Sequence, residues 1–157
     1  LMRRKDREVT DPQKIRELFS KCTCCRLGFQ DGEKVYVVPL HVGYVQREGR
    51  HVLYFHGAKE GRKLELIRKN GYAGFEMDTG YQLRPGSAAC EYTAAFQSLI
   101  GDGAVTVVED PAEKEQGLTA IMGQSTVQET WSVSKAGLDA VCVFRLDVET
   151  ISCKEHR

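Results

Sequence analysis

The stretch from Tyr54 to Lys63, YFHGAKEGRK, holds residue types well suited to binding chemistry. Three cations, Lys59, Arg62 and Lys63, crowd the point where a helix is expected to begin. A helix N-terminus has partial positive charge, so it disfavours cations and favours anions. Free backbone N–H groups, a glycine that allows close approach (Gly57) and three cations together predict a pocket for an anion such as a phosphate. The alternative is that the three basic side chains extend into water.

The same stretch does not fit the phosphate-binding loop of nucleotide triphosphatases. Gly57 and Gly61 enclose three residues where that motif needs four. Arg62 comes before Lys63, and Leu64 stands where a magnesium-binding hydroxyl belongs. The sequence therefore favours an anion site of another kind.

The cysteines suggest a metal or redox site at first sight. Cys22, Cys24 and Cys25 lie in KCTCCR, and Cys22 to Cys25 has C-x-x-C spacing. A structural zinc site usually needs a second such pair, and the other three cysteines stand alone. A redox C-x-x-C normally lies between a strand and a helix, whereas this one follows a helix and precedes a strand. We expect free thiols and no bound metal.

Composition narrows the class of protein. The chain has 22 Lys and Arg and 22 Asp and Glu, so its formal net charge is zero, which does not favour nucleic acid as a partner. No apolar stretch approaches the roughly 20 residues that span a membrane, and no signal peptide is visible. We expect one cytoplasmic domain over residues 1–157, because this length can bury a core of its own.

The elements that must position the cations are mostly strands. Helices are expected from Pro12 to about Lys21, from about Glu60 to Lys69, and from Pro111; strands are expected over 26–30, 34–45, 51–56, 72–78, 92–110 and 140–148. Asp11-Pro12 and Asp110-Pro111 are typical helix starts. Pro39 predicts an edge, a bulge or a ligand in its strand, and Gly101 or Gly103 predicts a bulge. The segment 125–138 is expected to hold a loop with a short helix.

Hairpins dominate this pattern, and strands do not alternate regularly with helices. The pattern predicts a mainly β (α+β) fold, an antiparallel split barrel of six strands with peripheral helices, rather than a doubly wound parallel sheet.

Six stretches spanning nearly the whole chain match a known superfamily in order and spacing: MRRKDREVTD, YVVPLHVGY, LYFHGAKEGRKLELIRKN, YTAAFQSLIGDGAV, EDPAEKEQGL and FRLDVETISCKE. On these stretches the sequence resembles the FMN-binding split-barrel superfamily that includes pyridoxamine 5'-phosphate oxidase. It resembles the nitroimidazole-resistance branch more closely. The resemblance implies a homodimer with FMN bound in a groove at the subunit interface.

The resemblance also implies roles for particular residues. Val38, Pro39 and Leu40 match the strand along the flavin ring. His56, Gly57 and Ala58 match the turn from ring to phosphate. Arg62 and Lys63 match the basic pair that binds the FMN phosphate, and Lys59 is the third cation of the same predicted pocket. Gln97 and Ser98 match polar residues that reach the cofactor. Two positions depart from the family pattern. Gly57 often is serine in relatives, and Gln97 often is arginine in the nitroimidazole-resistance branch.

FMN also fits the residues themselves. Dinucleotide folds usually show G-x-G-x-x-G between a strand and a helix, whereas the GDG at 101–103 leads into more strand. One compact cationic site suits one terminal phosphate.

The resemblance implies a reductase that passes electrons from NADH or NADPH to a nitro compound or another small acceptor. His56 is the candidate catalytic residue, because histidine titrates near neutral pH and could donate a proton to a reduced substrate. The alternative for His56 is a role in backbone contacts alone. His41 could line the same pocket, and Trp131 could cover a pocket or simply pack.

Pyridoxamine phosphate oxidase activity itself is not expected, because the chain ends ISCKEHR and lacks the R-L-x-P tail of those enzymes. The alternative function, from a different class, is a non-enzymatic flavin- or haem-binding protein.

Overall fold

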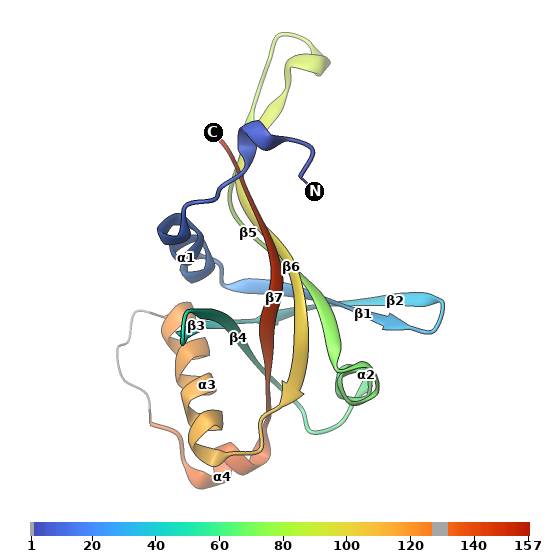
Figure 1. Cartoon of the computed structure of the whole chain (residues 1–157), viewed down its shortest axis with the longest axis vertical. Coiled ribbons are helices and arrows are strands. Elements are labelled where there is room, and N and C mark those ends of the chain that lie inside the picture. Colours follow the sequence, from blue (N-terminus) through green and yellow to red (C-terminus); the bar gives the residue numbers. More distant parts are fainter. Residues whose placement is uncertain (1, 127–131) are drawn as a thin grey trace.

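The structure, a computed structural model, describes residues 2–126 and 132–157. Seven strands form one antiparallel sheet in the order β2-β1-β5-β6-β7-β4-β3 (Figure 1). The strands are β1 (Cys24–Asp31), β2 (Lys34–His41), β3 (Gly43–Arg47), β4 (Arg50–Gly57), β5 (Tyr72–Arg84), β6 (Thr93–Val107) and β7 (Cys142–His156). The helices are α1 (Pro12–Lys21), α2 (Arg62–Asn70), α3 (Pro111–Ser125) and α4 (Lys135–Ala140), with short 3-10 turns η1 (Lys5–Arg7) and η2 (Ala89–Glu91).

The split barrel is confirmed, but the expected number of six strands is wrong. The strand expected over 34–45 is interrupted at Val42, so that β2 and β3 lie at opposite ends of the strand order. The chain thus leaves one edge of the sheet and enters the other, which rolls the sheet into a barrel. Val42 is buried at this corner, and a side chain on Gly43 would collide with the backbone of Ala120 and Ile121 in α3. The corner between the two strands is therefore also the point where the chain lies closest against α3.

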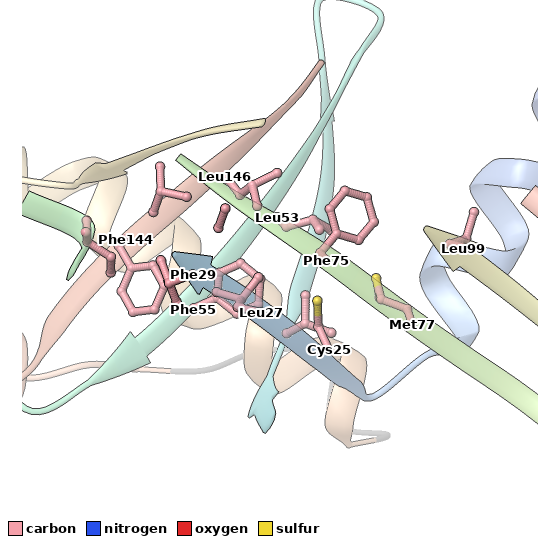
Figure 2. Close-up of a cluster of buried hydrophobic side chains, with 14 of the residues drawn as sticks. Cys25, Leu27, Phe29, Leu53, Phe55, Phe75, Met77, Leu99, Phe144 and Leu146 are labelled. Atoms are coloured by element: carbon pink, nitrogen blue, oxygen red, sulfur yellow. The ribbon is translucent and has the colours of Figure 1, made fainter. Parts of the chain in front are cut away.

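The core fills the inside of this rolled sheet. Figure 2 shows Leu27 and Phe29 of β1 among side chains from β4, β5, β6 and β7. Phe55 and Phe144 stack there with ring centroids 5.3 Å apart. Offset aromatic stacking and burial of large apolar side chains stabilise the barrel.

The helices begin and end as their caps predict. Asp11 accepts a hydrogen bond from the Gln13 N–H, and Asp110 accepts one from the Glu113 N–H, so the two Asp-Pro helix starts are confirmed. Helix α2 begins at Arg62, two residues later than expected. Lys59 lies in the loop before the helix, as expected. Gly61 at the N-cap has no side chain to satisfy the first backbone N–H groups, which leaves them available to a ligand.

Three strands run further than expected or contain irregularities. The ladder between β6 and β7 shifts register between Asp102 and Gly103, which confirms the bulge, and β5 has a further irregularity between Thr79 and Gln82. The last strand is expected over 140–148, yet β7 pairs with β6 as far as His156. Backbone pairing there does not depend on apolar side chains.

The hairpin of β5 and β6 extends beyond the rest of the sheet (Figure 1). The predicted short helix of the segment 125–138 is α4, while Trp131 lies outside the described residues. Within residues 2–126 and 132–157, no helix combines the length and apolar content that crossing a membrane requires.

Candidate functional site

The centre of the candidate site is the junction between β4 and α2. Strand β4 ends at Gly57, Ala58 to Gly61 form a loop, and the side chain of Lys63 turns back toward the strand end. A β-carbon added at Gly57 would lie 2.6 Å from Lys63 Nζ, so the ammonium rests against the glycine backbone. Lys63 Nζ also lies 5.7 Å from the centroid of the Phe144 ring, so the ammonium sits at the end of the barrel core. Glycine at position 57, in place of the serine of the family pattern, therefore leaves room for the side chain of Lys63.

Three basic side chains influence one another at this junction. Burial lowers the pKa of His56, and the charges of His41 and then Lys63 lower it further. His56 is exposed to solvent at its tip, yet burial is still the largest cause of its shift. Burial also lowers the pKa of Lys63. In the described part of the chain, no carboxylate forms an ion pair with Lys63. This basic cluster of His41, His56 and Lys63 would therefore be stabilised by a bound anion.

Arg62 is engaged elsewhere. Its Nη2 donates to Asp31 Oδ2 at 2.7 Å, and its Nε donates to the same oxygen at 3.1 Å. Its guanidinium also lies 4.3 Å from the centroid of the Tyr36 ring. These contacts tie the first turn of α2 to the β1–β2 hairpin. Nothing in the local sequence indicates that α2 lies beside the hairpin turn that follows Asp31.

Lys59 lies in the loop between β4 and α2. It lines a pocket of about 240 Å³ together with residues of α2, α3 and the adjoining ends of β6 and β7. The three cations of the opening stretch thus have three different surroundings: Lys63 lies at the barrel end, Arg62 pairs with Asp31, and Lys59 borders this pocket.

Val38, Pro39 and Leu40 lie on β2, an edge strand that pairs only with β1. The interpretation of Pro39 as an edge residue is confirmed. Val38 and Leu40 pack against the core, whereas Pro39 is exposed. His41 ends the same strand and is close enough to His56 for its charge to lower the pKa of His56. This edge therefore borders the basic cluster.

Gln97 and Ser98 are not brought to this cluster within one chain. They lie near the start of β6, whereas Val107 at its other end lies beside α2 in the 240 Å³ pocket. Ten residues of extended strand correspond to roughly 30 Å. Gln97 donates to Glu155 Oε2 at 2.6 Å and lines a separate pocket beside α1.

Arginine side chains pair with acidic side chains on the sheet. Arg26 Nη1 of β1 donates to Glu76 at 3.1 Å and to Asp78 at 2.9 Å on the neighbouring strand β5. Asp147 accepts from Arg145 Nε at 3.1 Å, two residues away on β7. The register between β1 and β5 brings Arg26 beside its two partners.

A second network that the sequence did not indicate fixes α3 on the barrel. The hydroxyl of buried Tyr54 donates to Glu113 at 3.0 Å and accepts from Arg47 at 2.7 Å. Arg145 also donates to Glu113, at 2.5 Å. Burial and then the hydrogen bond with Glu113 raise the pKa of Tyr54 to about 12, so the phenol stays protonated.

All six cysteines have free thiols. Cys22, Cys25 and Cys153 are buried among apolar side chains, and burial raises the pKa of Cys22 to about 12 and of Cys153 to about 11. The described residues contain no group of three or more His, Cys, Asp or Glu side chains arranged to hold a metal ion.

Comparison with known families agrees with the rolled sheet and the basic junction. The family model described as pyridoxamine 5'-phosphate oxidase matches residues 11–155. The chain belongs to the pyridoxamine 5'-phosphate oxidase family. The matched range includes α1 to α4, the β4–α2 junction and nearly all of the sheet. The match confirms the family resemblance described from the sequence.

Several solved structures have the same fold as this member of the pyridoxamine 5'-phosphate oxidase family. A candidate 5-nitroimidazole antibiotic resistance protein from Bacteroides thetaiotaomicron is 28% identical with a TM-score of 0.79, over 94% of this chain and 86% of that chain. The flavocytochrome Anf3 from Azotobacter vinelandii is 19% identical with a TM-score of 0.81, over 100% of this chain and 72% of that one. The FAD- and haem-binding protein from Mycobacterium smegmatis is 15% identical with a TM-score of 0.79, over 96% and 74%. Comparison with curated proteins finds no match.

Proposed function

We propose that this protein binds FMN and that the flavin phosphate lies at the junction of β4 and α2. The observation that carries the proposal is the half-buried ammonium of Lys63, which rests on the Gly57 backbone without a carboxylate partner in the described residues. A phosphate monoester fits this donor set, because uncapped N–H groups of α2 and one ammonium supply charge-assisted hydrogen bonds. Arg62 adds positive charge nearby and could share its guanidinium between Asp31 and the phosphate.

The flavin ring would then lie along the edge strand β2. Pro39 cannot donate a backbone hydrogen bond, and its exposed ring offers a flat apolar contact on the free edge. The core packing of Val38 and Leu40 holds that edge in place. His56 lies close enough to His41 at the end of this edge strand and to Lys63 for both charges to lower its pKa, so it lies near both ends of the proposed path from ring to phosphate.

A bound flavin supplies electron and hydride transfer, and the protein supplies orientation and protons. We propose an FMN-dependent oxidoreductase that takes electrons from NADH or NADPH and passes them to a nitro compound or another small acceptor. The lowered pKa of His56 keeps its ring largely neutral at pH 7 in the free protein. A bound phosphate would favour the protonated ring, which could then deliver a proton to the reduced acceptor. The 28% identical structure named for nitroimidazole resistance supports this class of acceptor.

The proposed cofactor site includes a second copy of the chain. Gln97 and Ser98 lie at the opposite end of β6 from Lys63, so a partner subunit is required for both groups to reach one flavin. The projecting β5–β6 hairpin also exposes Tyr81, Leu83 and Tyr92, of which Tyr81 is 71% exposed. Large apolar side chains on a projecting arm are typical of an interaction surface. We propose a homodimer in which this arm contacts the partner.

An absorbance spectrum of the purified protein tests the proposal. We expect the two visible bands of an oxidised flavin, bleaching on anaerobic addition of NADH or NADPH and recovery on addition of a nitroaromatic compound. A flavin that neither donor reduces would support the alternative of a non-enzymatic flavin carrier. A Soret band without flavin would support a haem-binding protein, a function that the names of two similar structures include.

A further inference from the structure

The sheet has an exposed apolar surface besides the β5–β6 arm. Val35 and Val37 on β2, Tyr72 on β5 and Ile100 on β6 are large apolar side chains that are exposed. Side chains alternate between the two faces of a strand, and neighbours of these residues, such as Leu99, pack into the barrel core. The four side chains therefore lie on the outer face of the strands β2, β1, β5 and β6. An open apolar face of this kind is typical of an interaction surface.

Two glycines leave a hollow in the middle of this outer face. Gly28 of β1 pairs with Gly74 of β5 and with the exposed Val37 of β2. Paired residues of antiparallel strands face the same side of a sheet, so both glycines lie on the outer face. They line a pocket of about 430 Å³ whose rim includes Asn70 and Tyr72. Pockets of roughly 300–1,000 Å³ enclose ligand-sized groups, so this hollow is large enough for an aromatic side chain.

The bulge in β5 turns the apolar side chains of the arm to the same outer face. The ladder between β5 and β6 shifts register between Thr79 and Gln82, where β5 has an extra residue. An extra residue reverses which side chains of a strand face outward. Leu83 pairs with Ala94 of β6, and alternation along β6 puts Ala94 on the same side as Ile100. The hollow and the arm thus belong to one continuous face.

The positions along β5 suit an exchange between two copies of the chain. Gly74 and Tyr81 are equally far from the point between residues 77 and 78. Tyr72 and Leu83 are also equally far from that point. A two-fold interface uses the same surface patch on both subunits. A two-fold axis at this point would bring Tyr81 of each copy over Gly74 of the other, and Leu83 over Tyr72.

The charges of the two surfaces are complementary. Arg84 follows Leu83 on the arm, and Asp102 pairs with Gly74 beside the hollow. Within the described chain, neither Arg84 nor Asp102 forms an ion pair. Glu91, an acid of the arm, already accepts hydrogen bonds from backbone N–H groups of the arm itself. The arm therefore offers a cation to a face that offers an acid.

The geometry points to a reciprocal exchange in which each copy of the chain inserts Tyr81 into the glycine hollow of the other, so that Arg84 lies beside Asp102. This inference rests on the proposed homodimer and names the surface that receives the arm. The phenol ring would fill the hollow, and its hydroxyl would meet the polar rim. Asn70 Nδ2 donates to the Gln30 carbonyl oxygen at 2.6 Å, which leaves the amide oxygen of Asn70 to accept from that hydroxyl.

Disulfide crosslinking tests the exchange in a Cys90→Ser chain, which lacks the exposed native thiol. Tyr72→Cys with Leu83→Cys should give a covalent dimer when diamide is added as the oxidant, and this pair keeps Tyr81 and the hollow intact. The two positions lie roughly 35 Å apart along one extended strand, so they cannot form a disulfide within a chain. Each single substitution should give no covalent dimer. Leu83→Cys with Glu115→Cys, on the exposed side of α3, is the matched control and should give none either.

Filling the hollow gives an independent measurement. Gly74→Leu places a side chain where Tyr81 would enter, and it should shift the sedimentation of the protein from dimer to monomer. A β-carbon on Gly74 meets no atom closer than 3.8 Å, so the chain should keep its fold, as checked by circular dichroism. Gly28→Ala adds only a methyl group to the same hollow and should leave the dimer intact.

Two results would overturn the exchange while leaving the proposed homodimer in place: a dimer that forms no crosslink between positions 72 and 83, or a dimer that Gly74→Leu does not weaken. A flavin-loaded monomer would overturn both the exchange and the homodimer. Failure of the proposed flavin site gives a different pattern, namely a chain that forms the crosslink but binds no FMN.

Discussion

Arg62 and Lys63 are adjacent in sequence, yet within residues 2–126 and 132–157 only Arg62 has a carboxylate partner, Asp31, at 2.7 Å. The guanidinium of Arg62 links α2 to the β1–β2 hairpin, while the ammonium of Lys63 turns inward to Gly57. Two neighbouring cations therefore have different roles: one positions the helix, and the other remains free to bind an anion.

The first prediction separates these two cations. Lys63→Gln should weaken FMN binding tenfold to a hundredfold, because a charge-assisted hydrogen bond to phosphate contributes about 1.5–3 kcal/mol. Arg62→Gln should weaken it less, because Arg62 would have to leave or share Asp31. Riboflavin lacks the phosphate and should bind both variants as it binds the parent. Equal FMN affinities for the parent and a folded Arg62→Gln, Lys63→Gln double variant would show that both cations are directed into solvent.

The second prediction concerns the space at Gly57. Gly57→Ala introduces a β-carbon 2.6 Å from Lys63 Nζ, so the flexible end of the lysine must move. We expect severalfold weaker FMN binding, unchanged riboflavin binding and little loss of stability. Gly28→Ala on β1 is the matched control, because its β-carbon meets no atom closer than 4.0 Å. An FMN affinity that does not respond to Gly57→Ala would mean that the ammonium position is irrelevant to the phosphate.

The third prediction uses pH. Burial lowers the pKa of Lys63 below its usual 10.5, and a bound phosphate would raise it again. The contribution of Lys63 to FMN binding is therefore complete below the pKa of Lys63 in the free protein and is lost as pH rises from there through the higher pKa of the complex. We expect FMN affinity to fall in this alkaline range, relative to riboflavin measured at the same pH.

Lys63→Arg provides the control for that measurement. Arginine stays charged throughout this range, so the additional pH dependence of FMN over riboflavin should disappear. If the variant retains the same alkaline loss, another group titrates at the site.

The fourth prediction concerns the thiols. Cys90 is exposed, whereas Cys22, Cys25 and Cys153 are buried and their pKa values are raised. At pH 7.5 a thiol reagent should label Cys90 fastest, and the three buried thiols only after unfolding, because the thiolate is the reactive form. The Cys90→Ser variant should lose the fast phase of labelling, as followed by mass spectrometry.

Elemental analysis of the same protein should find no stoichiometric zinc. About one zinc per chain that is lost in Cys22→Ser would contradict the free-thiol interpretation.

The fifth prediction tests the arm of β5 and β6. Leu83 is 55% exposed in the chain, and Leu83→Glu should disrupt a dimer by placing a charge in an apolar contact. Gln82→Glu adds the same charge at the adjacent, already polar position and should disrupt it less. Sedimentation velocity should show a dimer for the parent and a shift to monomer with loss of flavin for Leu83→Glu. A flavin-loaded parent that sediments as a monomer would exclude the proposed interface.

Much of the fold follows from local residue patterns. Asp-Pro pairs determine where α1 and α3 begin, because each aspartate caps N–H groups of its own helix. Alternating apolar residues and turn glycines indicate the strands and their hairpins. The excess of cations at the start of α2, and hence an anion site there, is also visible in ten consecutive residues.

The rest of the fold and of the candidate site depends on contacts between residues that are distant in sequence, so only the tertiary structure decides it. The sequence does not show that one expected strand divides into β2 and β3 at the point where the chain lies closest against α3. Nor does it show that Asp31 holds Arg62, because that pairing depends on how the β1–β2 hairpin meets α2. Local sequence determines which elements form and which charges they carry. Packing of the rolled sheet determines which of those charges are paired and which, like Lys63, remain available to a ligand.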